Sequence, residues 1–116
     1  MRGIGRATGL SVVDVAGATA DEHTDYSAKL RAALDAFNEH DFVLLHIEAP
    51  DEVSHKRDSL LKVMVLEEID RKILAPLLKA NINLEITIQS DHATSSISGK
   101  HLDCPVEVIK YTTKKQ

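Results

Sequence analysis

The chain has 116 residues, 43% of them hydrophobic and 28% charged, which suits one globular domain with its own core. Its formal net charge is −4, and the only basic cluster is the Lys114–Lys115 tail, so nothing predicts the basic patch that nucleic-acid binding requires. The apolar runs are too short to span a bilayer, and a single cysteine, Cys104, excludes an internal disulfide and favours a reducing cytoplasm.

The first half of the chain predicts two strands separated by a helix. Residues 10–15 are apolar and β-branched, which indicates a short buried strand. Thr24 or Asp25 can cap the following helix. The apolar positions at helical spacing in that helix are Tyr26, Leu30, Ala33, Leu34 and Phe37. Residues 42–47 form a continuous apolar run, typical of a buried strand in a parallel sheet, and Pro50 ends it because proline has no N–H to donate.

The second half predicts a long helix and then two strands. Asp58 or Ser59 can cap the helix, which runs to about Lys79 and which Pro76 could kink or shorten. Its expected buried stripe is Leu66, Ile69, Ile73 and Leu77. Residues 84–89 alternate between apolar and polar, residues 90–100 form a polar loop, and residues 105–111 form a final strand. This order predicts a single α/β domain over residues 1–116, with a mainly parallel sheet and helices on its faces.

Carboxylates and histidines recur where predicted strands end. Asp51 and His55 follow residues 42–47 at i, i+4, Asp91 and His92 follow the next strand, and His101 stands alone. Ligands collect outside the carboxyl ends of strands in open α/β sheets, and these side chains suit Zn²⁺ or Mn²⁺. The sequence thus predicts that these five residues converge on a divalent-metal site. The alternative is that Asp51 is an ordinary helix N-cap and His55 a solvated side chain.

Several stretches occur in the same order and at compatible spacings as landmarks of one known family. They are Gly3–Arg6, Ala16–Thr19, Asp41–Val43, His46–His55, Glu68–Arg71, Asp91–Thr94 and His101. In these stretches the chain resembles the archaeal-type cofactor-independent phosphoglycerate mutases. That family belongs to the alkaline-phosphatase superfamily, whose fold is an α/β sandwich with a two-metal site. The resemblance implies that Asp51, His55 and His101 hold one metal ion, and that Asp91 and His92 contribute to the other.

The chain also departs from the family pattern. The family carries an Asp and a nucleophilic Ser in an N-terminal part upstream of the region matched here, so no catalytic residue is identified and the second ion lacks two ligands. Cys104–Glu107 stands where the family usually reads Asp-Pro-Val-Pro, and Ser95 stands at a family proline. We therefore expect at most one well-ligated ion, Mn²⁺ or Zn²⁺, in a chain that resembles the C-terminal part of a longer metalloenzyme.

The resemblance implies a cytoplasmic enzyme that interconverts 3-phosphoglycerate and 2-phosphoglycerate, a phosphorylated small-molecule substrate, and no nucleic-acid or membrane partner. Because the nucleophile is not in the matched region, we expect the isolated chain to be inactive as a mutase. Two alternatives stay open. One is part of another phosphatase or phosphomutase of the same superfamily, and the other is a non-catalytic metal-binding module.

Overall fold

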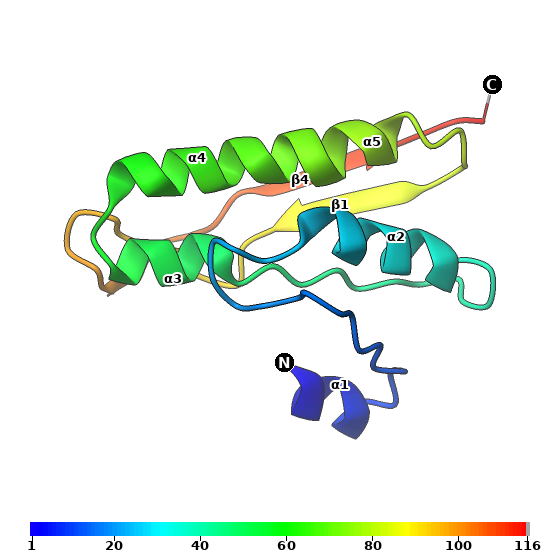
Figure 1. Ribbon diagram of the computed structural model, residues 1–116, viewed down its shortest axis with the longest axis horizontal. Coiled ribbons are helices and arrows are strands. Elements are labelled where there is room, and N and C mark those ends of the chain that lie inside the picture. The colour runs from blue at the N-terminus through cyan, green and yellow to red at the C-terminus, as the bar shows by residue number, and fades with distance from the viewer. Residues whose placement is uncertain (116) are drawn as a thin grey trace.

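The computed structural model describes residues 1–115 and has a mixed α/β architecture (Figure 1). The elements, in chain order, are α1 (Arg2–Ala7), α2 (Tyr26–Ala36), α3 (Ala49–His55), α4 (Ser59–Ile69), the π-helix η1 (Asp70–Leu74), α5 (Ala75–Leu78), β1 (Glu85–Gln89), β2 (Ala93–Thr94), β3 (His101–Leu102) and β4 (Val108–Thr112). In Figure 1 the helical run from α4 to α5 forms one long rod, with α3 and α2 beneath it and the β1–β4 pair beside it.

The long helix begins and continues as its sequence predicts. The Asp58 carboxylate accepts the Leu61 backbone N–H at 2.8 Å, which confirms the predicted cap. Near the other end Pro76 cannot donate to the carbonyl four residues earlier. Just before Pro76, the backbone hydrogen bonds span five residues instead of four, and the Ala75 N–H donates to the Asp70 carbonyl. The proline thus marks a π turn within a helix that continues to Leu78.

Helices build the hydrophobic core. Its buried members are Tyr26, Leu30, Ala49, Val53, Val65 and Ile73, which come from α2, α3, α4 and η1. The Asp25 carboxylate caps α2 by accepting the Ala28 N–H, as predicted. The buried stripe on the long helix was partly wrong, because Leu66 is 49% exposed while Val65 is buried. Apolar residues lie on several sides of α4, so their spacing alone does not identify the buried face.

The expected mainly parallel sheet is not found in the described residues. Their strands form two antiparallel pairs, β1 with β4 from Glu85↔Thr112 to Gln89↔Val108, and β2 with β3. Residues 42–47 and 10–15, both expected to be strands, belong to no ladder within residues 1–115. An apolar run favours a buried, extended chain but does not specify a hydrogen-bonding neighbour, and here neither segment meets one.

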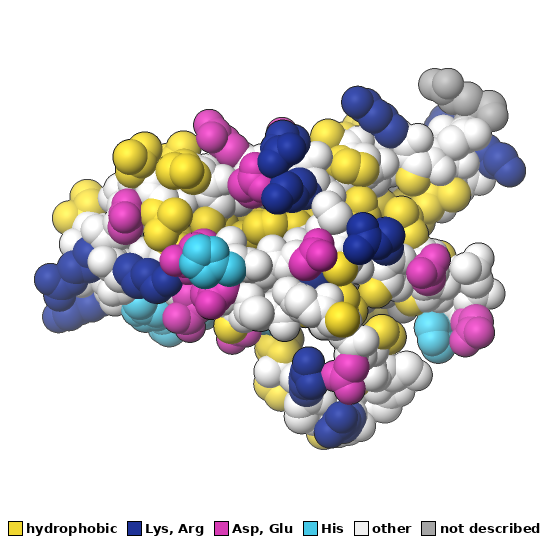
Figure 2. Space-filling model, viewed as in Figure 1, with side chains coloured by type: hydrophobic (Ala, Val, Ile, Leu, Met, Phe, Trp, Pro, Cys, Tyr) yellow, Lys and Arg dark blue, Asp and Glu magenta, His cyan; other side chains and the backbone are white. Residues whose placement is uncertain are grey.

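Much apolar surface remains in contact with solvent. Figure 2 shows hydrophobic side chains along α4, where Leu60 is 72% exposed. A cavity of about 810 Å³ lies between the N-terminal segment, α2 and residues 40–48. Phe42 and Leu44 at its edge are largely exposed. Cys104 is exposed as well. Within the described part of the chain, no helix is long and apolar enough to cross a membrane.

Candidate metal centre

Helix α3 presents Asp51 and His55 on one face. Pro50 is tolerated in its first turn because that N–H would have no helical partner. Val53 is fully buried against the core and fixes the helix, while positions i and i+4 share the other face. Glu48 occupies the N-cap position, so the reading of Asp51 as an ordinary N-cap is wrong. Asp51 lies inside the first turn, and its side chain points away from the helix backbone toward residues 92–101.

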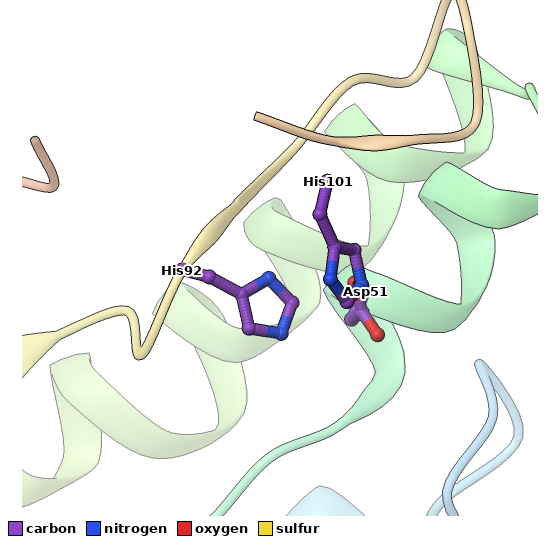
Figure 3. A group of neighbouring side chains, drawn as sticks. All are labelled: Asp51, His92 and His101. Carbon is purple, nitrogen blue, oxygen red and sulfur yellow. The ribbon is translucent and has the colours of Figure 1, made fainter. Parts of the chain in front are cut away.

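The short β2–β3 pair brings His92 and His101 to the same place. Thr94 pairs with His101 across this ladder, and His92 lies two residues before Thr94. The rings of His92 and His101 stack with centroids 3.9 Å apart and planes tilted by 30°. Figure 3 shows both rings beside the Asp51 carboxylate. Ligand atoms of Asp51, His92 and His101 all lie within 4.8 Å of one another.

His55 lies beside both Asp51 and His101. Its Nε2 lies 3.3 Å from Asp51 Oδ2 and 3.2 Å from His101 Nε2, and His101 Nε2 lies 3.7 Å from Asp51 Oδ1. Two ligands about 2.1 Å from one ion at the tetrahedral angle lie about 3.4 Å apart. The separations among Asp51, His55 and His101 therefore fit a shared ion.

The orientation of His55 supports the same fit. Its Nδ1 lies 2.8 Å from the Gly99 carbonyl oxygen, which can only accept a hydrogen bond. The neutral ring therefore carries its proton on Nδ1, and its Nε2 lone pair faces both Asp51 Oδ2 and His101 Nε2. In this tautomer His55 Nε2 and Asp51 Oδ2 are both acceptor atoms, 3.3 Å apart, and both are available to bind one cation.

The electrostatics keep Asp51 in its ligand form. Burial raises the pKa of this carboxyl, but the Thr94 hydrogen bond and the neighbouring His55, His92 and His101 outweigh it and hold the pKa below its usual value. A carboxyl with a lowered pKa is ionised throughout the neutral range. Asp51 thus remains available as an anionic ligand where the imidazoles are neutral.

Asp91 lies at the edge of the cluster and is exposed. Its Oδ1 accepts the His92 backbone N–H at 3.0 Å and lies 3.6 Å from His92 Nε2. The resemblance implied that Asp91 and His92 serve a separate ion, whereas the structure also groups His92 with Asp51 and His101. All five predicted residues therefore lie in one neighbourhood, with Asp51 and His101 at its centre.

Sequence reasoning missed Thr94 and Gly99 as supporting residues. Thr94 belongs to the two-residue strand β2, which His92 directly precedes, and the prediction of a polar loop over residues 90–100 hid this pairing. Gly99 has φ +69°, which glycine adopts readily. The buried Nε2 of His46 has no partner in the described residues, and the His46 carbonyl accepts from Lys29 Nζ.

Replacing Gly99 with Ala is expected to destabilise the chain by about 1–3 kcal/mol, the usual cost of a left-handed backbone for a non-glycine residue. The new Cβ would also lie 3.1 Å from the His55 carbonyl oxygen, so the loop that orients the His55 ring must shift. Urea unfolding and a Zn²⁺ titration should both show a loss. Gly3→Ala is the matched control, because nothing lies within 4 Å of its added Cβ and α1 favours alanine. Equal losses in both variants would contradict this role for Gly99.

The fold and this cluster define a mixed α/β domain with a candidate divalent-metal centre. A family model for the metalloenzyme superfamily matches residues 4–116, and the chain belongs to that superfamily.

Named relatives agree with the resemblance seen in the sequence. The 2,3-bisphosphoglycerate-independent phosphoglycerate mutase of Methanosarcina mazei is 36% identical over 99% of this chain and 30% of its own length. A second such mutase, from Methanothermobacter thermautotrophicus, is 40% identical over 94% of this chain and 28% of its own length. A solved structure from Pyrococcus horikoshii superposes with a TM-score of 0.88 at 30% identity, covering 96% of this chain and 34% of that one. The resemblance to phosphoglycerate mutases is thereby confirmed, for a chain that spans about 30% of these relatives' length.

Proposed function

We propose that this chain provides the metal-binding part of a phosphoglycerate mutase that interconverts 3-phosphoglycerate and 2-phosphoglycerate. The observation that carries the proposal is that Asp51, His55 and His101 lie together at separations that suit one ion. All three residues lie in the part of the chain that matches the mutases in sequence. His92 and Asp91 extend the same cluster toward a second ion.

The chemistry of these side chains fits Zn²⁺ or Mn²⁺, both of which take imidazole and carboxylate ligands. A divalent ion bound there would neutralise charge on a phosphate ester. The chain's own residues bind and orient: Asp51 contributes the anionic ligand, and the Gly99 carbonyl holds His55 with its Nε2 toward the site. The substrate class is a phosphorylated small acid, and the single cysteine supports a cytoplasmic setting.

We infer that the part of the relatives' length that this chain does not cover supplies the rest of such a fold. Residues 42–47 join no ladder within residues 1–115, and Phe42 and Leu44 are largely exposed, which supports this because exposed apolar surface is stabilised when another layer covers it. We infer that the isolated chain binds metal without performing the mutase reaction. The isolated chain would then behave as the non-catalytic metal-binding module, while the mutase activity would belong to the longer enzyme.

Ser54, the serine next to His55, is not placed to act as the nucleophile of this reaction. Ser54 lies between Asp51 and His55, but it is fully buried and its Oγ donates to the Pro50 carbonyl at 2.6 Å. A nucleophile must reach the phosphorus beside the metal ions, and Ser54 faces the helix backbone instead.

The test is a coupled mutase assay of the pure chain with added Mn²⁺, run beside an assay with a chromogenic phosphate ester. We expect no mutase turnover by the chain alone, and turnover when the upstream part of a related mutase is added. Mutase turnover by the chain alone at roughly 1–10³ s⁻¹, the usual enzyme range, would overturn the inference that the isolated chain binds metal without catalysis. A chain that binds neither Zn²⁺ nor Mn²⁺, alone or combined, would overturn the metal-binding proposal.

A further inference from the structure

The hydroxyl of Thr94 lies between two of the candidate ligands. Its Oγ1 is 2.5 Å from Asp51 Oδ1 and 3.1 Å from His92 Nδ1. Thr94 is only 8% exposed, so water does not compete freely for these contacts. Its backbone is fixed too, since it pairs with His101 in the β2–β3 ladder and its carbonyl accepts from Lys62 Nζ at 2.8 Å.

Counting protons decides the direction of both hydrogen bonds. A threonine hydroxyl has one hydrogen to donate, and an ionised carboxylate can only accept. The hydroxyl therefore donates to Asp51 and must accept from His92, so His92 Nδ1 carries a hydrogen. The neutral His92 ring then has its lone pair on Nε2, the atom that faces Asp91.

We propose that Thr94 is a positioning residue that sets the direction of the Asp51 carboxylate and fixes His92 as the Nδ1–H tautomer, leaving Nε2 free to bind a metal ion. The metal-binding role of these residues rests on the proposed function. The hydrogen-bond relay, which runs from His92 Nδ1 through the Thr94 hydroxyl to Asp51, does not require an ion. Thr94 thus does for His92 what the Gly99 carbonyl does for His55. Groups that orient metal ligands in this way typically contribute 10–100-fold to metal affinity.

The experiment compares the parent chain with Thr94→Val and Thr94→Ser. Valine keeps the branched shape and the strand preference of threonine but cannot donate or accept, whereas serine keeps the hydroxyl. Long-range ¹H–¹⁵N NMR of the metal-free chain reports which nitrogen of His92 is protonated, and Zn²⁺ titration of the same samples reports affinity. Circular dichroism checks that each variant is folded.

We expect the metal-free parent to show Nδ1–H at His92, Thr94→Val to show a mixture of tautomers, and Thr94→Ser to restore the parent spectrum. Zn²⁺ affinity should fall by about 10–100-fold in Thr94→Val and recover in Thr94→Ser. Protonation on Nε2 in the parent would overturn the inference without needing any variant. A Thr94→Val chain with the parent's tautomer and affinity would also overturn it. If the tautomer follows the hydroxyl but no chain binds metal, the relay stands and the proposed metal function fails instead.

Discussion

Replacing Asp51 with Asn is expected to remove most of the chain's affinity for Zn²⁺ or Mn²⁺. Asp51 lies within ligand distance of His55 and His101 and also belongs to the group with His92. Asn keeps the shape and an oxygen that can accept from Thr94, but it removes the anionic charge of the carboxylate ligand. The loss should exceed the roughly 10–100-fold that a merely supporting group costs. Titration calorimetry at neutral pH measures it.

His23→Ala is the matched control, because His23 is a largely exposed histidine in the loop before α2 and should leave affinity unchanged. His55→Ala and His92→Ala then show whether His55 or His92 binds the ion together with Asp51 and His101. A strong loss in His55→Ala supports the set of Asp51, His55 and His101, and the parent chain should show at most one tight site. Unchanged affinity in a folded Asp51→Asn chain would contradict the whole assignment.

Replacing Ile73 with Ala is expected to destabilise the chain by about 2–5 kcal/mol, the usual cost of truncating a buried isoleucine. Ile73 is 5% exposed and joins η1 to Tyr26 and Leu30 of α2 in a small core. Since small domains are typically stable by about 5–15 kcal/mol, this is a large share of the total. Urea unfolding followed by circular dichroism measures the change.

Leu60→Ala is the control for this variant, because Leu60 lies on the same long helix but is 72% exposed. It should change stability by no more than about 0.5 kcal/mol. If both variants lost the same amount, the core would not be centred where α2 meets η1.

The sequence predicted most reliably the features that neighbouring residues decide. The sequence narrowed each helix cap to two neighbouring residues, and in both cases the Asp is the cap, because its carboxylate accepts an N–H three residues further along the chain. For Pro76 the sequence predicted only a kink or an early end, whereas the structure shows a π turn in a helix that continues to Leu78. The five candidate ligands could be named from residue type and position, and the family resemblance from short stretches in order.

Tertiary structure decided the pairing and the geometry. Residues 42–47 read as a strand, but a strand also needs a neighbour, and sequence pattern carries no information about which segment supplies it. The grouping of His92 with Asp51 and His101, and the roles of Thr94 and Gly99, depend on the β2–β3 pair reaching α3. These contacts join residues more than forty positions apart in the sequence. They depend on how the intervening segments pack, which local helix and strand propensities do not determine.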